Sequence, residues 1–289
     1  MKDTILYGDC RKTLQQFVDA GVKARMCVTS PPYYGLRDYG NESDQIGLEE
    51  SPEEFIQQLV EVFRGVRDVL HDDGTLWVNI GDSYYNYRSV KGQALPKQSV
   101  ASNNQDLPQT RNPRRGNKLE GLKDKDLIGI PWMLAFALRA DGWYLRQDII
   151  WSKPNPMPES MKDRCTKSHE YIFLLSKSKN YYFDVDAIKE PTVEGNDLKR
   201  KRSVWEVTTK PYKGAHFAVY PSKLIEPCIL AGSEKEDIIL DPFMGSGTTA
   251  IVAKELGRNY IGCELHCDYE NLIEQRLSST SGSLTQFLI

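Results

Sequence analysis

Short hydrophobic runs and longer amphipathic segments alternate along this chain. Seven short runs are rich in β-branched or aromatic residues, the pattern of buried strands. The expected strands are Thr4–Tyr7, Met26–Thr29, Thr75–Ile80, Tyr144–Trp151, Tyr171–Ser176, Asp237–Leu240 and Asn259–Cys263. Segments with hydrophobic residues at helical spacing are Arg11–Ala20, Pro52–Leu70, Leu127–Ala140, Ser222–Ala231, Thr248–Leu256 and Tyr269–Leu277. The alternation predicts an α/β fold in which helices cover both faces of a largely parallel sheet.

The start of the second expected helix has a sequence signal of its own. Ser51 precedes Pro52, and Glu54 follows Ser51 by three residues, which is the spacing of a capping box. Hydrophobic residues then recur on one face of the helix at Phe55, Leu59, Val62, Phe63 and Val66. We therefore expect a well-capped helix whose hydrophobic face packs on the sheet.

Two stretches, residues 83–125 and 152–215, interrupt the alternation. The first contains few aliphatic residues and holds nine Lys or Arg residues against three acids, a local net charge of +6. It is either a disordered surface insertion or a segment that becomes ordered on nucleic-acid phosphates, and the two descriptions are compatible. The second stretch is rich in proline and aromatic residues and contains the basic run 199–202. Such a run is usually a solvated face, so only its position gives it weight.

Bulk properties limit the class of protein. The 289 residues suffice for two average domains or for one large α/β domain with insertions. No hydrophobic run approaches the length of a membrane span, and the first residues lack the features of a secretory signal, so we expect a cytoplasmic protein. The net charge of −3 requires any nucleic-acid-binding surface to be local. The six cysteines show no metal-ligand spacing, so we expect reduced thiols and no metal site.

A glycine-rich turn follows the expected strand at Asp237–Leu240. The chain continues Asp-Pro-Phe-Met-Gly-Ser-Gly-Thr-Thr from Asp241 to Thr249 and then enters a helix. Glycines allow the backbone to approach a ligand closely, and the first turn of a helix presents free N–H groups. A dinucleotide site uses the same device, and the spacing alone does not exclude it. The acid and the aromatic residue before Gly245 favour instead a ligand with a cationic amino-acid part and an exposed adenine.

A second segment, Ser30-Pro31-Pro32-Tyr33, follows the expected strand at Met26–Thr29. The two prolines fix the backbone and lack N–H groups, so the carbonyls around them are free to accept hydrogen bonds. Ser30 adds a side-chain oxygen, and Tyr33 offers a flat face on which a nucleobase can stack. Such a pocket could hold an –NH₂ group and direct its lone pair at an electrophile. Taken alone the segment is also compatible with a plain proline turn.

Together the two segments resemble the motifs of DNA amino-methyltransferases. Ser30–Tyr33 is similar to the catalytic motif of that family, and Asp241–Thr248 is similar to its S-adenosylmethionine motif. The catalytic motif comes first, which is the permuted order of the β group. The resemblance implies a Rossmann-like fold with a seven-stranded, mostly parallel sheet, one antiparallel strand and target-recognition insertions. It divides the chain into a catalytic and cofactor-binding domain, 1–151 and 216–289, which includes the basic loop at about 83–125, and a target-recognition region at 152–215.

The resemblance also assigns residues by position. The catalytic residues implied are Ser30, Pro31, Pro32 and Tyr33. The residues implied to bind S-adenosylmethionine are Asp9, Cys10, His216, Phe217, Pro221, Asp241, Phe243, Gly245, Ser246, Gly247, Thr248 and Glu264, the last as the acid that binds the ribose. Candidates for DNA contact are Arg37, Arg114, Arg115, Lys153, Arg164, Lys199, Arg200, Lys201 and Arg202.

The implied reaction is direct methyl transfer to a base flipped out of double-stranded DNA, without a covalent enzyme intermediate. Serine at the first motif position favours the N4 amine of cytosine by resemblance, and the N6 amine of adenine is the alternative. A DNA-binding protein without activity and a small-molecule methyltransferase are two further hypotheses. The intact motif pair argues against the first, and the basic loop and the proline-rich stretch argue against the second. A companion restriction endonuclease and the choice between monomer and homodimer are not determined by the sequence.

Overall fold

A computed structural model describes residues 1–35, 44–85, 119, 121–192, 195, 197–209 and 220–283. Within these residues, eight strands form one sheet in the order β1-β10-β9-β2-β3-β5-β4-β8. In that order the strands are Thr4–Tyr7, Asn259–Glu264, Ile238–Asp241, Ala24–Thr29, Leu70–Ile80, His169–Ser176, Tyr144–Ser152 and Val204–Glu206. Two further short strands, β6 (Glu190–Pro191) and β7 (Leu198–Lys199), pair with each other as a separate hairpin.

The directions of the strands confirm a mostly parallel sheet with one antiparallel member. Strand β5 is antiparallel to both neighbours, β3 and β4, whereas all other pairs are parallel. The expected number of seven is wrong by one, because β8 extends the edge beyond β4. Trp151 is the register partner of Trp205, and both side chains are buried. A three-residue edge strand is too short to show a periodic pattern in sequence.

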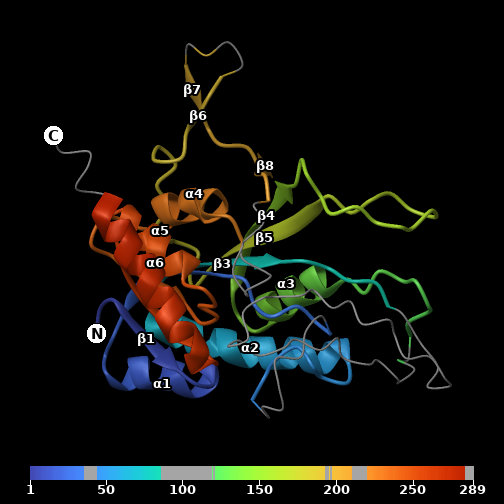
Figure 1. Cartoon of the computed structure of the whole chain (residues 1–289), viewed down its shortest axis with the longest axis horizontal. Helices are drawn as coiled ribbons and strands as arrows, with labels where there is room; N and C mark the ends of the chain where they lie inside the picture. The colour runs from blue at the N-terminus through green and yellow to red at the C-terminus, as the bar shows by residue number, and fades with distance from the viewer. Residues whose placement is uncertain are drawn as a thin grey trace.

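Helices cover both faces of the sheet, as the alternation predicted (Figure 1). The helices are α1 (Cys10–Asp19), α2 (Pro52–Val69), α3 (Ile130–Ala140), α4 (Ser222–Gly232), α5 (Thr248–Glu255) and α6 (Glu270–Ser283), the last preceded by the 3₁₀ turn Cys267–Tyr269. One hydrophobic cluster joins the sheet to α1, α2 and α3, and a second joins its other face to α4, α5 and α6. The sheet is therefore the middle layer of three.

Local signals explain where the helices begin. The capping box at Ser51 and Glu54 is present, with both reciprocal hydrogen bonds formed. Helix α3 begins three residues later than expected because Gly129, its N-cap, has a φ of 87° and no capping side chain of its own. Asp82 supplies the acceptor instead, and its Oδ1 accepts from the backbone N–H of Gly129 at 3.0 Å and of Ile130 at 3.1 Å. The end of β3 thereby fixes the start of α3.

The two stretches that interrupt the alternation differ in the structure. Residues 86–118 and 120, most of the predicted basic loop, lie outside the described residues. Its two ends are paired: Tyr84 forms an antiparallel bridge with Leu127, and the Tyr85 N–H donates to the Asp126 carbonyl at 2.8 Å. The stretch 152–215 contributes β5 and β8 to the sheet. The sheet therefore combines strands from the predicted catalytic domain and from the predicted target-recognition region. Residues 153–168 extend beyond the sheet as a long connection (Figure 1).

Candidate functional site

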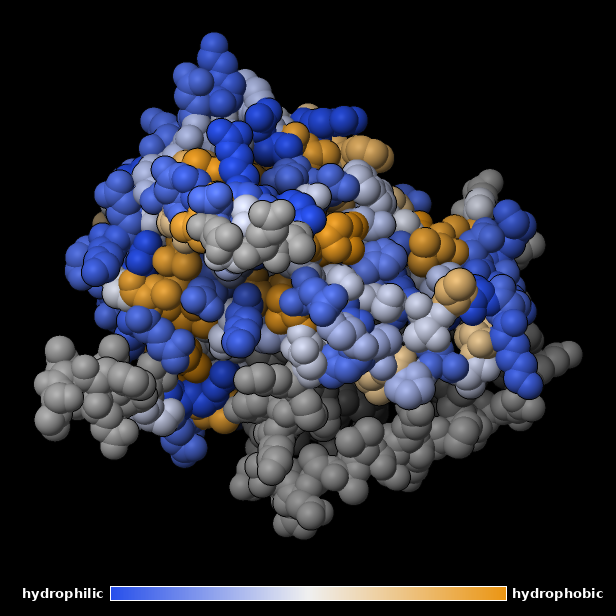
Figure 2. All heavy atoms as spheres, turned by 90° about the horizontal axis from the view of Figure 1, so that it is seen from above, coloured by the Kyte–Doolittle hydropathy of each residue, from blue (hydrophilic) through white to orange (hydrophobic). Residues whose placement is uncertain are grey.

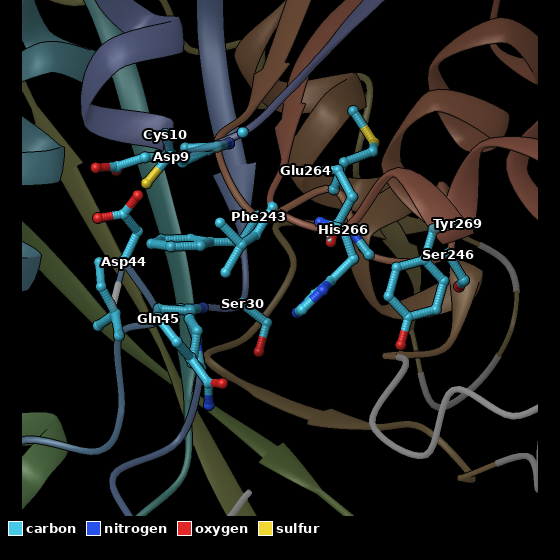
Figure 3. A pocket seen from close by; sticks show the side chains of 18 of the residues that line it. Asp9, Cys10, Ser30, Asp44, Gln45, Phe243, Ser246, Glu264, His266 and Tyr269 are labelled. Atoms are coloured by element: carbon cyan, nitrogen blue, oxygen red, sulfur yellow. Dashed lines mark hydrogen bonds between the residues drawn. The ribbon is translucent and has the colours of Figure 1, made fainter. Parts of the chain in front are cut away.

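A cavity of about 1130 Å³, its open mouth included, lies where four parallel strands end. Its walls come from the segments that follow β1 (Gly8–Cys10), β2 (Ser30–Tyr33), β9 (Pro242–Ser246) and β10 (Leu265–Tyr269), with Glu264 at the end of β10. These strands are neighbours in the order β1-β10-β9-β2, so segments more than 200 residues apart in sequence meet at one edge. Figure 3 shows their side chains directed at a common space around Phe243.

The position of the cavity follows from the topology. Strand β9 leads through α5 to β10 on one side, whereas β2 leads through α2 to β3 on the other. The connections therefore leave β9 and β2 in opposite directions, and open α/β sheets bind ligands at such a switch point. Because segments after β2 and after β9 both line the cavity, groups from the two sequence motifs face one space.

The glycine-rich turn forms one wall of the cavity. Gly245 and Gly247 have φ values of 53° and 81°, a conformation that favours glycine, and Gly247 is the N-cap of α5. Ser246 and Thr248 line the cavity, and the Ser246 hydroxyl accepts from Arg276 Nη1 at 2.6 Å. The predicted strand, turn and helix are all present, and the turn faces the cavity.

Glu264 is an acid buried at the floor of the cavity, with 7% of its surface exposed. Its Oε2 accepts from the Gly245 N–H at 2.7 Å, and its Oε1 accepts from the His266 N–H at 3.1 Å. Burial raises the pKa of Glu264 to about 7, partly opposed by these hydrogen bonds. The carboxylate is held in place by the turn, and its remaining acceptor capacity can bind hydroxyl donors of a ligand.

Asp241 lies beneath the cavity and does not line it. Its Oδ1 accepts from the Thr29 hydroxyl at 2.6 Å and from the Phe243 N–H at 3.0 Å. Its Oδ2 accepts from the hydroxyls of Tyr220 at 3.0 Å and Thr249 at 2.5 Å. Burial raises its pKa. With four internal donors, Asp241 ties β9 to β2, α5 and the residue before α4. Asp241 therefore lies behind the wall of the cavity. The sequence analysis predicted instead that it contacts the ligand.

Phe243 does line the cavity, as predicted for the aromatic residue of the turn. In Figure 3 its ring lies between Asp9 and Asp44 on one side and Ser30, Glu264 and His266 on the other. The ring provides a hydrophobic surface within a wall of polar groups. Such a surface is suited to a flat heterocycle.

The segment after β1 also reaches the cavity. Asp9 is the N-cap of α1, and its carboxylate accepts from the backbone N–H of Arg11 at 3.0 Å and from Arg11 Nε at 2.9 Å. Arg11 Nη1 in turn donates to Gln58 Oε1 at 2.5 Å, which joins α1 to α2. Cys10 is buried, and burial raises the pKa of its thiol to about 12. Cys10 is therefore a packing residue of the wall rather than a nucleophile.

The Ser-Pro-Pro-Tyr segment occupies the wall opposite the end of β1. Ser30, Pro31, Pro32 and Tyr33 all line the cavity. The Tyr33 hydroxyl donates to Glu170 Oε2 at 2.7 Å. Burial first, and the Glu170 charge second, raise the pKa of Tyr33 well above its ordinary value. The structure therefore brings the two motifs of the sequence together in one cavity.

Several residues of the wall were not identified from the sequence. They are Tyr220, Asp44, Gln45, Ile46, His266 and Tyr269. Tyr220 precedes Pro221, which was predicted to contact a ligand but is the N-cap of α4 and does not line the cavity. His266 was recognisable as the second residue after the acid that ends β10. Asp44–Ile46 carried no signal, because nothing in their sequence indicates where the loop before α2 folds. His216 and Phe217 lie outside the described residues.

Most predicted DNA-contact residues that the structure describes are paired with acids. Lys199, Lys201 and Arg202 surround Glu190 at 3.9, 3.8 and 3.2 Å, at the base of the β6–β7 hairpin. Arg202 and Arg200 are exposed, and three cations share the carboxylate of Glu190. Figure 2 looks onto the end of the molecule that carries the hairpin, and hydrophilic side chains dominate that face.

Two other predicted contact residues lie near the cavity edge of the sheet. Arg164 donates to Glu159 Oε2 at 2.5 Å, and its guanidinium lies 3.8 Å from the centre of the Tyr84 ring. The side chain of Lys153 is only 18% exposed and forms an ion pair with Glu170, so it is not placed for contact with a phosphate. Arg37, Arg114 and Arg115 lie outside the described residues.

The cysteines are unpaired. Cys10, Cys27, Cys228 and Cys263 are buried, whereas Cys165 and Cys267 are exposed. Over the described ranges, no cluster of three or more His, Cys, Asp or Glu side chains is arranged to hold a metal ion. None of the helices built from the described residues is both long enough and hydrophobic enough to span a membrane.

Comparison with known sequences finds a protein family whose model matches this chain. The family model for N6/N4 methyltransferases, described as DNA methylase, matches residues 24–275. The Type II methyltransferase M.SmaI of Serratia marcescens is 50% identical over 277 residues, which cover 94% of this chain and 90% of the relative. The match spans both motifs and the long connection between them.

Comparison with solved structures supports the same fold. The PvuII DNA methyltransferase, described as cytosine-N4-specific, superposes with a TM-score of 0.67 at 17% identity and covers 96% of this chain and 86% of its own. A complex of M1.HpyAVI with S-adenosylmethionine superposes with a TM-score of 0.60 at 19% identity and covers 95% of this chain and 99% of its own. At these identities the likeness concerns the fold.

Proposed function

Because this chain belongs to the DNA methylase family of N6/N4 methyltransferases and uses S-adenosylmethionine, we propose that it methylates the N4 amine of cytosine in double-stranded DNA. The observation that carries the proposal is the meeting of Ser30–Tyr33 with the turn at Phe243–Thr248 in one cavity. One segment is built to hold a planar amine and the other to hold a nucleoside cofactor. Their shared space is where a methyl group can pass between them.

The wall formed by β9 and β10 fits the cofactor. Phe243 offers a flat hydrophobic face, Glu264 offers acceptors for ribose hydroxyls, and Gly245 lines the cavity without a side chain. Asp9 adds a second acid on the wall at the end of β1. S-adenosylmethionine supplies the electrophilic methyl group when it is bound. We propose that these residues hold its adenosine and orient the methyl group toward Ser30.

The segment Ser30–Tyr33 would bind the target base. Cytosine N4 is a weak nucleophile because its lone pair is delocalised into the ring. Acceptors at the Ser30 hydroxyl and at the Pro31 carbonyl would hold the two amine hydrogens out of the ring plane, which restores the lone pair. The Tyr33 ring would stack on the base after it leaves the duplex. Orientation of both reactants accounts for the catalysis, and no covalent enzyme intermediate is needed.

Two observations favour cytosine over adenine. Ser30 is a neutral hydroxyl at the position where adenine enzymes, by the resemblance, usually carry a carboxylate or an amide. The PvuII enzyme, which shares the fold, is described as cytosine-N4-specific. Adenine N6 is the alternative product, and it is a defined outcome of the test below.

The test is transfer of a labelled methyl group from S-adenosylmethionine to duplex DNA, followed by nucleoside analysis. We expect N4-methylcytosine. N6-methyladenine would refute the choice of base, and no incorporation into any duplex would refute the activity. The variant Ser30→Ala should lower turnover about 100-fold, the effect of removing one positioned polar group from a reacting centre, and should leave cofactor affinity unchanged. Ser178→Ala, in the turn after β5, is the matched control.

We also propose that the basic stretch 83–125 and the cluster around Glu190 contact DNA phosphates. Three cations around one acid leave the cluster positive, and the ends of the basic stretch lie at the cavity edge of the sheet next to Arg164. Phosphate contacts predict that affinity for duplex DNA falls steeply with salt. Replacing Arg200 and Arg202 by Gln should reduce the slope of log affinity against log salt. An unchanged slope would exclude this cluster from the interface.

A further inference from the structure

We propose that Arg276, on α6, is a positioning residue of the cofactor site, which makes the hydroxyls of Ser246 and Thr248 donors to the carboxylate of S-adenosylmethionine. The inference rests on the proposed function, because it places the methionine part of the cofactor in the cavity described above. Arg276 does not line the cavity and is 28 residues from Thr248 in sequence. It belongs to neither of the two sequence motifs.

The distribution of charge on the cavity wall indicates where a carboxylate can lie. Asp9, Asp44 and Glu264 line the cavity, whereas no lysine or arginine of the described residues does. Figure 3 shows Asp9 and Asp44 at one end of the space around Phe243. Ser246 lies at the other end, and Glu264 lies between them in this view. Because acids repel a carboxylate, the cofactor carboxylate belongs at the end near Ser246.

Arg276 brings a cation behind this end of the cavity. Its Nη1 donates to the Ser246 carbonyl and, at 2.6 Å, to the Ser246 hydroxyl. Its Nη1 and Nη2 also donate to the Thr248 hydroxyl at 3.5 and 3.4 Å. Ser246 and Thr248 are both buried, and both line the cavity. One guanidinium therefore contacts the two hydroxyls that the glycine-rich turn presents to a ligand.

These contacts determine the direction of the hydrogen bonds. A guanidinium can only donate, so the oxygens of Ser246 and Thr248 are the acceptors, and each hydroxyl keeps its own hydrogen. Within the described part of the chain, neither hydroxyl donates that hydrogen to a protein acceptor. Both hydrogens are therefore available to an acceptor in the cavity. The positive charge behind the oxygens polarises the hydroxyls and strengthens them as donors.

The charge of Arg276 is close enough to act on the ligand directly as well. A carboxylate bound to the Ser246 hydroxyl would lie one hydrogen bond beyond the contact of that oxygen with Nη1. The two opposite charges would then be about 5 Å apart. Ser246, which separates them, is 2% exposed, so water screens this attraction only weakly. Arg276 thus contributes to cofactor affinity without touching the cofactor.

The first experiment compares two ligands in the variant Arg276→Gln. Decarboxylated S-adenosylmethionine lacks the carboxylate but keeps the adenosine, the sulfonium and the amine of the cofactor. In calorimetric titrations, affinity for S-adenosylmethionine should fall at least about 10-fold, the lower end for a hydrogen bond to a charged group. Affinity for the decarboxylated ligand should change by less than about 2-fold, since it has no group for these donors. Arg139→Gln, exposed on α3, is the matched control and should change neither affinity.

The same comparison separates this role from a structural one. Arg276 also donates to the Ser246 carbonyl, so its loss removes a contact that holds the turn. A loosened turn would weaken both ligands equally, and equal losses would overturn the inference. In a Ser246→Ala background the substitution of Arg276 should cost less affinity for S-adenosylmethionine, because one of the two hydroxyls is already absent. An undiminished loss there would show that the Ser246 hydroxyl does not transmit the effect.

These titrations need no DNA, so the two proposals can fail separately. If the ratio of the two affinities falls in Arg276→Gln but the original protein methylates no DNA, the proposed function fails and the role of Arg276 stands. If DNA is methylated and the ratio does not change, only the role of Arg276 fails. In an active protein, Arg276→Gln should raise the KM for S-adenosylmethionine and leave turnover at saturation within about 2-fold of the original.

Discussion

The buried acid Glu264 leads to a prediction about pH that can be worked out in numbers. Its folded-state pKa is about 7, whereas its ordinary value is 4.5. Between these two pH values the folded protein retains a proton that the unfolded chain has released. The free energy of unfolding therefore falls as the pH rises, by about 1.4 kcal/mol per pH unit. Across the full window the loss is about 3 kcal/mol, and it stays constant above pH 7.

The assay is chemical denaturation of the cofactor-free protein at several pH values between 5 and 8, with Glu264→Gln as reference. The amide does not titrate, so all other groups cancel in the difference between the two proteins. The stability of the variant minus that of the original protein should rise by about 2.5 kcal/mol between pH 5 and pH 8. Any constant effect of the lost hydrogen bonds does not alter this change. A difference that stays constant over the whole range would show that burial does not raise the pKa of Glu264.

The same titration should appear in cofactor binding, since we propose that the ionised form accepts the ribose hydroxyls. At pH 6 only about a tenth of Glu264 would be ionised, and at pH 8 about nine tenths would be. Affinity for S-adenosylmethionine should therefore rise about 10-fold over this interval. Calorimetric titration measures it, and Glu264→Gln should show no such rise. A pH-independent affinity would remove Glu264 from the binding site. The buried carboxylate of Glu264 thus lowers the free energy of unfolding, whereas its ionised form contributes to cofactor binding.

Three further predictions concern residues around the site. Asp241→Ala removes the acceptor shared by Thr29, Phe243, Tyr220 and Thr249, of which only Tyr220 and Thr249 can still bond to each other. It should lower the free energy of unfolding by about 3 kcal/mol, measured by denaturation, and a loss below about 1 kcal/mol would contradict the network. Gly81→Ala places a methyl group against the Tyr33 ring. It should lower the turnover of methyl transfer at least about 10-fold and leave the affinity for the cofactor unchanged. Equal turnover in the variant and the original protein would show that the ring can move freely. A thiol reagent should modify Cys165 and Cys267 rapidly in the native protein and the other cysteines only after unfolding, as mass spectrometry of the labelled peptides would show.

Local sequence patterns determined most of the secondary structure. The capping box at Ser51, the hydrophobic stripe of α2 and the glycines at 245 and 247 act within a few residues of one another. Such interactions are specified by adjacent residues, so their outcome is visible in the sequence. The two motifs also indicated one shared site, because segments that follow parallel strands end at the same edge of a sheet. The missed element, β8, is held by its pairing with β4 rather than by a pattern of its own.

Tertiary structure decided which predicted residues line the cavity. Asp241 and Glu264 look equivalent in sequence, each an acid at the end of a strand. Four internal donors hold Asp241 beneath the floor, whereas Glu264 lines the cavity. Lys153 looked like a surface cation, but Glu170 from the adjacent strand β5 pairs with it. Sequence patterns indicate whether a side chain is buried or charged, but they do not indicate which residues it contacts. That depends on strand order and register, which are set by contacts between residues far apart in the chain.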